Sequence, residues 1–302
     1  MSGWKEVADD IAARGNVFDI VRRENLQSLF KKTGRNVIAY YSGWLQKQGT
    51  PIPVEQFNLS DADKSGFMAA VHGMDKTKGL DLILHTPGGD VGATEALGDY
   101  LRAMFGNDIR AIVPQLAMSG GTLLACVGKE IVMGKHSSLG PIDPQFGPLS
   151  AKGIVAEFTQ AMNEAKTSPA TIPLWQVIVG KYPPGFVGVC AQAIKWSEDI
   201  AKKWLETGMF LGPDGQDKSV ATAAAEKAVK GLSNHPSHAR HISADEAGQL
   251  GLKIISLEED KELQDLVLTV HHCYIQTLAS GDTTRITENH NGMAVVSNFT
   301  LR

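Results

Sequence analysis

The sequence is poor in cysteine. Its 302 residues include three, Cys126, Cys190 and Cys273, which stand far apart with no Cys-x-x-Cys pair. That spacing excludes a disulfide framework and a cysteine-based zinc site. We therefore expect each cysteine to be a small buried hydrophobic residue in a reducing compartment.

Long apolar runs are also missing. The runs at 109–113 and 123–127 are short and flanked by polar residues, whereas a membrane span needs roughly 20 successive apolar residues. The first ten residues carry acids where a secretion signal needs a basic stretch followed by an apolar run. The sequence therefore predicts a cytoplasmic protein with no membrane span.

Charge of one sign does not accumulate anywhere in the chain. The formal net charge is -4, with 29 lysine and arginine residues mixed among 33 aspartate and glutamate residues. Without a basic stripe, nucleic acid is not expected as a partner. No Gly-x-Gly-x-x-Gly opens a helix after a strand, so a nicotinamide cofactor is not expected either, and we predict no cofactor.

The first half of the chain reads as a parallel α/β sheet. Residues 4–32 have the apolar spacing of amphipathic helices. Strands are predicted at 36–41, 80–85, 109–113 and 130–133, and helices follow two of them at 93–105 and from about Ser119. Successive strand–loop–helix units imply parallel strands, whose carboxyl ends form the ligand site.

The second half reads as mainly helical. After Pro148 we expect helices with an interruption at 181–185 and a long helix over 188–205. A helix at 244–250 precedes a β-like piece at 252–257, and residues 258–302 are predicted to form a helix and a short β-rich tail.

Two glycine-rich loops carry the chemical signal. Gly88 and Gly89 leave backbone N–H groups uncovered by side chains, as an oxyanion hole requires. One unit later, Ser119 stands between small residues at a strand-to-helix turn, and the N–H of Gly120 follows it. Each loop alone is a common turn or helix cap, but their placement in adjacent units predicts a serine nucleophile beside oxyanion donors.

These loops resemble a known family. The segments are His85-Thr-Pro-Gly-Gly-Asp90, Ala117-Met-Ser-Gly-Gly-Thr122 and Ser138-Leu-Gly-Pro-Ile-Asp-Pro144. Together they resemble the serine dehydrogenase proteinase family, a relative of signal peptide peptidase A and, more distantly, of the Clp protease proteolytic subunit. The resemblance covers roughly residues 30–295 and includes Glu288-Asn-His-Asn-Gly292.

The resemblance implies a fold and a site. The fold is a Clp/crotonase-like α/β spiral of β-β-α units with a mainly parallel sheet, in one domain over 1–302 with a helical extension at 1–32, a catalytic core at 33–257 and a carboxyl-terminal helix and tail at 258–302. Ser119 is implied as the nucleophile, with oxyanion donors from Gly88, Gly89 and Gly120. The partners implied are a protein or peptide substrate and further copies of the chain in a homo-oligomer.

The general base is less clearly marked. Where the Clp subunit has its histidine, this chain has Ile142-Asp143-Pro144. The signal peptide peptidase branch uses a desolvated lysine in a later helical region, a role that Lys181 and Lys166 fit. We favour Lys181 because it adjoins the apolar run Trp175–Val179, and a histidine such as His136 or His241 stays open.

Two further groups of residues have alternative interpretations. Gly140, Pro141, Ile142 and Asp143 are expected to line the substrate groove, and Asp143 is either a turn former or a member of a triad. His235, His238 and His241 recur at spacings of three, which suggests either a metal site or a solvated loop. We favour the loop and predict no metal, because no acidic or thiol partner accompanies them.

The hypothesis from sequence is therefore a serine endopeptidase that acts through an acyl-enzyme. In it Ser119 attacks the scissile carbonyl, a lysine or histidine accepts the proton, and glycine amides hold the oxyanion. Two alternatives remain, an acyl-CoA-processing enzyme of the crotonase type and a catalytically inactive scaffold that assembles into rings.

Overall fold

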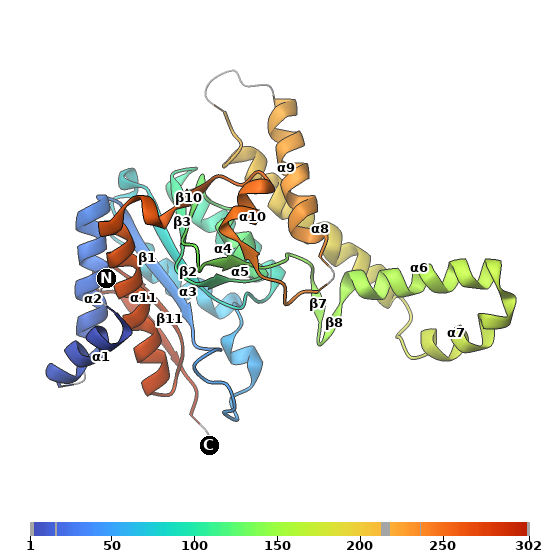
Figure 1. Ribbon diagram of the computed structural model, residues 1–302, viewed down its shortest axis with the longest axis horizontal. Coiled ribbons are helices and arrows are strands. Elements are labelled where there is room, and N and C mark those ends of the chain that lie inside the picture. The colour runs from blue at the N-terminus through green and yellow to red at the C-terminus, as the bar shows by residue number, and fades with distance from the viewer. Residues whose placement is uncertain (1–2, 16, 213–217, 236, 301–302) are drawn as a thin grey trace.

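A seven-stranded sheet forms the centre of the molecule (Figure 1). The computed structural model describes residues 3–15, 17–212, 218–235 and 237–300. In spatial order the strands are β10 (Ile254–Ser256), β5 (Glu130–Met133), β3 (Ile109–Val113), β2 (Leu80–His85), β1 (Asn36–Ser42), β11 (Thr283–Asn289) and β12 (Ala294–Asn298). The first five are parallel, and β11 and β12 are antiparallel to their neighbours. The predicted mainly parallel α/β fold is thus confirmed.

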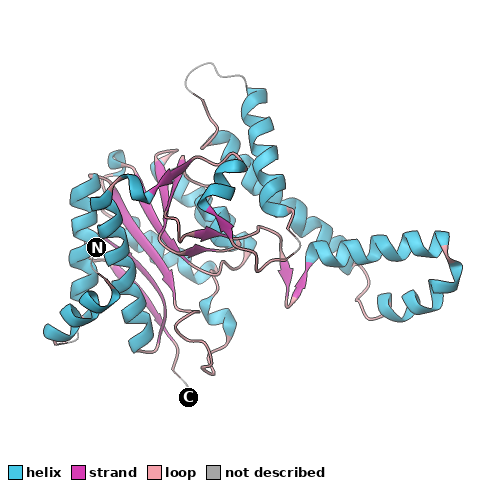
Figure 2. Ribbon diagram, viewed as in Figure 1, coloured by secondary structure: helices cyan, strands magenta, loops and turns pink. Residues whose placement is uncertain are grey.

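Helices cover both faces of this sheet (Figure 2). Successive side chains of a strand point to opposite faces, so each face of the sheet has its own apolar core. Ile38 and Leu82 belong to one core, whereas Val37 and Ile83 belong to the other. The first core includes side chains of α3 (Asp61–Val71), α4 (Val91–Phe105), α5 (Gly120–Ala125), α8 (Phe186–Thr207), α9 (Lys218–Ser233) and α10 (Ala244–Gln249). The second is built with α2 (Phe18–Thr33) and α11 (Lys261–Ser280).

The predicted amino-terminal helices are present as α1 (Trp4–Ala13) and α2. Gly34 ends α2 with a φ of 67°, a left-handed conformation that glycine adopts without strain. Val7 and Ile11 of α1 pack against Cys273 of α11, and all three cysteines are buried, as expected. Burial raises the pKa of Cys126 to about 12, so its thiol is inert.

The carboxyl-terminal strands are part of the main sheet. The β-rich tail expected from sequence comprises β11 and β12, and β11 pairs with β1 along Ile38–Ser42. The motif that begins at Glu288 holds this strand in place: the buried Glu288 carboxylate accepts hydrogen bonds from Arg22 (2.8 Å) and Tyr274 (2.9 Å). The motif therefore anchors β11 between α2 and α11.

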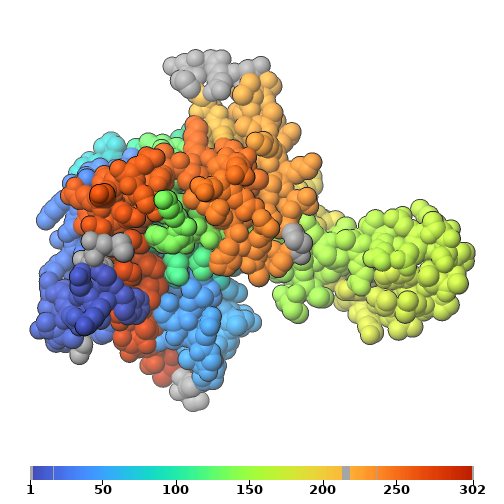
Figure 3. Space-filling model, in the orientation of Figure 1, coloured from blue at the N-terminus to red at the C-terminus, as the bar shows by residue number. Residues whose placement is uncertain are grey.

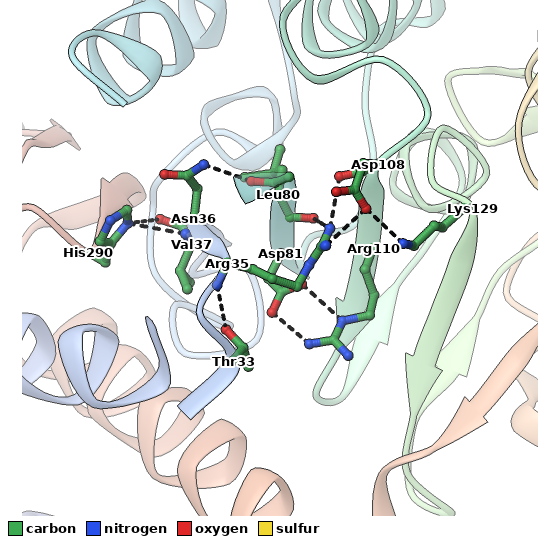
Figure 4. A network of polar contacts seen from close by, with 11 residues as sticks. Thr33, Arg35, Asn36, Val37, Leu80, Asp81, Asp108, Arg110, Lys129 and His290 are labelled. Atoms are coloured by element: carbon green, nitrogen blue, oxygen red, sulfur yellow. Dashed lines mark hydrogen bonds and ion pairs between the residues drawn. The ribbon is translucent and has the colours of Figure 1, made fainter. Parts of the chain in front are cut away.

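A network of charged side chains lies at the amino-terminal ends of the parallel strands (Figure 4). Asp81 is fully buried and binds Arg35 (2.8 Å) and Arg110 (2.7 Å), and Asp108 binds Arg35 (2.9 Å) and Lys129 (2.7 Å). The network joins β1, β2 and β3 at the end of the strands opposite to Ser119.

Removing Asp81 is expected to destabilise the fold strongly. Asp81→Ala leaves two largely buried guanidinium groups without their shared carboxylate, a change that costs about 3–5 kcal/mol of unfolding free energy. Urea denaturation measures the loss. Asp108→Ala is the matched control, because the Asp108 side chain is 44% exposed and exposed pairs contribute at most about 1 kcal/mol. Equal effects of the two variants would contradict this account of the network.

A helical arm projects from the body of the molecule (Figures 1 and 3). It consists of α6 (Ala151–Thr167), the 3-10 turn Pro169–Thr171 and α7 (Ile172–Val179), and the chain returns through α8. The interruption predicted at 181–185 separates α7 from α8. None of the residues of α7 is buried, and Leu174 and Val177 are 61% and 64% exposed.

Candidate active site

Ser119 has an unusual backbone conformation. It follows the short strand β4 (Leu116–Ala117) and directly precedes α5, with a φ of 50° and a ψ of -114°. Within the described residues it is the only non-glycine residue with positive φ. Such a conformation costs about 1–3 kcal/mol and persists where the surroundings enforce it, often at functional sites. A sharp strand-to-helix turn of this kind presents the nucleophile in serine hydrolases with a nucleophile elbow.

The first glycine loop lies against this serine. Thr86 connects the two loops, because its N–H donates to Leu116 O (3.1 Å) and its carbonyl accepts from Met118 N (3.0 Å). Gly88 has a φ of 94°, and a Cβ atom there would lie 2.6 Å from Gly120 N and 2.9 Å from Ser119 Cβ. No side chain fits at position 88, so the requirement for glycine is steric as well as conformational.

Two amides beside Ser119 are available as donors. The Gly88 N–H donates to the Thr86 hydroxyl (3.1 Å). In contrast, we find no acceptor for the Gly89 N–H in the described part of the chain, and Gly120 is the first residue of α5, where amides lack an intrahelical acceptor. A Cβ atom on Gly120 would lie 3.2 Å from Gly89 N, so the two amides are close together.

The segment that carries Asp143 runs beside the serine loop. Strand β6 (Ser138–Leu139) pairs with β4, which precedes Ser119. The buried Thr122 hydroxyl lies 2.8 Å from both Ala117 O and Gly140 O and accepts from Gly140 N (2.9 Å). A Cβ atom on Gly140 would lie 2.7 Å from Met118 Cε. Gly140, Pro141, Ile142 and Asp143 are all buried, and their role in the groove stays a prediction.

Asp143 is paired with a histidine. The ring Nδ1 of His238 lies 2.8 Å from Asp143 Oδ1, and the side chains are 28% and 4% exposed. Burial by itself would raise the pKa of Asp143, but the hydrogen bonds from His238 and Ser150 outweigh it and lower that pKa. An ionised carboxylate here fixes the imidazole with a proton on Nδ1 and leaves Nε2 to accept one.

The bases expected from sequence are all exposed. Lys166 is in the last turn of α6 and Lys181 follows α7, so both are exposed on the arm. His136 is exposed in the turn after β5, and His241 is exposed just before β9 (Ile242–Ser243). Among the residues that the structure describes, we find no hydrogen bond between any of these four side chains and a carboxylate.

Sequence reasoning did not pair His238 with Asp143. The two residues are 95 positions apart, and the hint in the sequence was the histidine triplet on a polar loop. Within the described residues, no group of three histidine, cysteine, aspartate or glutamate side chains is placed to hold a metal ion. In that same part of the chain, no helix has the length and apolar character needed to cross a membrane.

His85 is the last residue of β2 and directly precedes the first glycine loop. It is fully buried among the rings of Trp44 (4.5 Å), His271 (5.1 Å) and Tyr41 (5.5 Å). Neither ring nitrogen has a hydrogen-bond partner in the described residues. Burial lowers the pKa of His85 to about 3, so the imidazole is neutral.

This buried imidazole predicts acid sensitivity. Below the unfolded-state pKa of about 6.5 the unfolded chain binds a proton that the folded chain does not bind until about pH 3. The unfolding free energy therefore falls with decreasing pH, by up to about 1.4 kcal/mol per pH unit for this residue. Urea denaturation of the wild type and of His85→Leu between pH 6.5 and 5 tests this. The variant should show a shallower fall, and parallel curves would contradict the prediction.

Comparison with known proteins places these residues in a family context. A sequence model of the ClpP-like SDH-type serine proteinases matches residues 12–178, which include both glycine loops, Ser119 and Asp143. His238 lies beyond the matched region.

Two relatives are uncharacterised proteins of Methanocaldococcus jannaschii. MJ0137 is 41% identical over 109 residues, which are 36% of this chain and 37% of the relative. MJ1495 is 27% identical over 229 residues, which are 76% of this chain and 70% of the relative. The chain thus aligns with little more than a third of the length of MJ0137 and with most of MJ1495.

Proposed function

Because the chain belongs to the ClpP-like SDH-type serine proteinase family, we propose that it is a peptidase with Ser119 as nucleophile and His238, oriented by Asp143, as general base. One observation carries the proposal. The strained Ser119 lies against the Gly88–Gly89 loop, with the amides of Gly89 and Gly120 beside it. This is the arrangement that acyl transfer to a serine requires.

The proposed mechanism assigns each group a step. His238 Nε2 accepts the Ser119 hydroxyl proton as Oγ attacks the carbonyl carbon of the scissile bond. The Gly89 and Gly120 amides donate to the oxyanion, and Asp143 stabilises the imidazolium. His238 then protonates the leaving amine, and a water activated by the same imidazole releases the acyl group from Ser119.

We prefer His238 to the two lysines as the base. The His238–Asp143 pair is already assembled within one chain, on a segment that packs against the serine loop. Lys166 and Lys181 are exposed on the arm, so either would need a large displacement of the arm or the arm of a neighbouring copy. Both lysines stay predictions from sequence.

Homo-oligomeric assembly and a cytoplasmic location are also part of the proposal. The exposed apolar side chains of α7 support assembly, because large apolar patches on a folded protein commonly mark contact surfaces. Protein or peptide is the proposed substrate, and no cofactor takes part in the mechanism.

A fluorophosphonate probe tests the proposed chemistry. The folded protein should gain one phosphonyl group, located by peptide mass spectrometry on Ser119, and urea-unfolded protein should gain none. A peptide aldehyde should slow labelling, whereas an acyl-CoA should not. Absence of labelling in the folded protein would favour the inactive scaffold, and protection by acyl-CoA alone would favour the crotonase-type enzyme.

A further inference from the structure

The second oxygen of the Asp143 carboxylate is held from the hairpin that follows it. While Oδ1 faces His238, Oδ2 accepts from Gln145 Nε2 (2.7 Å) and from Ser150 Oγ (2.9 Å). Gln145 lies on β7 (Gln145–Phe146) and Ser150 on β8 (Leu149–Ser150). With both oxygens engaged and 4% of the side chain exposed, the carboxylate has one favoured orientation.

Ser150 has a second role at the start of the arm. It is the N-cap of α6, and its Oγ accepts from Gly153 N (3.4 Å). The next residue, Ala151, donates from its N–H to Pro144 O (3.0 Å), immediately after Asp143. The first turn of the arm is therefore bonded both to the Asp143 side chain and to the backbone beside it.

The base of the arm is the part that packs against the body. Ala151 and Ile154 are buried with Cys190 of α8, and Lys152 binds Glu198 of α8 (3.0 Å). Beyond this base, α6 and α7 extend away from the body of the molecule (Figure 1). A displacement of α6 at its base thus acts directly on the donors that hold Asp143.

We propose that Ser150 is a positioning residue, which sets the orientation of the Asp143–His238 pair and ties it to the base of the arm. This inference rests on the proposed function, because it concerns the same catalytic pair. Ser150 touches neither substrate nor the reacting atoms, so its loss should change the turnover of bound substrate and leave substrate binding unaltered.

Four variants separate this role from helix capping. Ser150→Ala removes both the hydroxyl donor and the cap, and Ser150→Thr retains both. Ser150→Asp retains the cap but cannot donate to Asp143, and Gln145→Leu removes the other donor without touching the cap. The matched control is Ser243→Ala, which removes the serine N-cap of α10, a residue with no bond to Asp143.

The expected result is a loss of kcat at constant KM. For Ser150→Ala and Ser150→Asp we expect kcat for a fluorogenic peptide to fall about tenfold, with KM within about twofold of the wild type. Ser150→Thr and Ser243→Ala should retain wild-type kcat, and Gln145→Leu should lie between. If Ser150→Asp retains wild-type kcat, Ser150 serves as a helix cap and the inference is wrong.

A spectroscopic readout keeps this test independent of turnover. Side-chain nitrogen NMR of His238 should show a protonated Nδ1 in the wild type and in Ser150→Thr, and a changed tautomer balance in Ser150→Ala. Unchanged His238 signals in Ser150→Ala would overturn the inference even if the protein cleaves peptides. Changed signals in a protein that hydrolyses no peptide would support the positioning role and contradict the proposed function instead.

Discussion

Replacing Ser119 by alanine is expected to lower kcat for peptide hydrolysis by about 10⁴ to 10⁶. In the proposed mechanism the variant lacks the atom that forms the acyl-enzyme, and the oxyanion donors alone would provide only residual catalysis. The fold should be unchanged, because the Ser119 side chain makes no capping hydrogen bond to α5. A fluorogenic peptide assay measures the loss, and thermal unfolding shows whether the variant is folded.

A neighbouring serine provides the control. Ser138 lies on β6, next to the strand that leads to Ser119, and Ser138→Ala should change kcat by no more than a few fold. If folded Ser119→Ala retained a hundredth or more of wild-type kcat, Ser119 would not be the nucleophile, and the peptidase mechanism would be wrong.

His238→Ala is expected to lower kcat by about 10³ to 10⁶ at neutral pH. In the proposed mechanism His238 accepts the Ser119 proton and returns one to the leaving amine, and the variant lacks that group. Asp143→Asn should lower kcat by a similar factor of about 10⁴, because an amide favours the wrong tautomer of the imidazole. The same fluorogenic peptide assay measures kcat for both variants.

Matched variants identify the base. His235→Ala and His241→Ala should retain activity. Each removes a histidine near His238 in the sequence but leaves the hydrogen bond between His238 and Asp143 in place. Lys166→Ala and Lys181→Ala should retain activity as well. If a lysine variant loses activity while His238→Ala retains it, the base expected from sequence is right and His238 is not.

Local sequence patterns were sufficient to predict that the two glycine loops lie close together. The strands β2 and β3 follow from short apolar runs, and the glycine-containing loops come after them in the sequence. Parallel strands then bring both loops to one edge of the sheet. The structure adds the steric reason, because no side chain fits at Gly88 against Ser119.

Local sequence patterns could not predict contacts between residues that are far apart in the sequence. The bond between His238 and Asp143 depends on how α8 and α9 return the chain to the sheet, and 95 residues separate the partners. The sheet position of the predicted β-rich tail also depends on distant residues, since the buried Glu288 of β11 binds Arg22 and Tyr274 and β11 pairs with β1. Nothing local in the tail distinguishes a strand of the main sheet from a peripheral one.

The central claim is that Ser119, His238 and the amides of Gly89 and Gly120 face one reacting carbonyl within a single chain. A crystal structure of the phosphonylated protein tests it most directly. The account predicts phosphorus bonded to Ser119 Oγ, the phosphoryl oxygen within hydrogen-bond distance of both amides, and His238 Nε2 beside Oγ. A phosphoryl oxygen turned away from these amides, or a lysine in the place of His238, would contradict it.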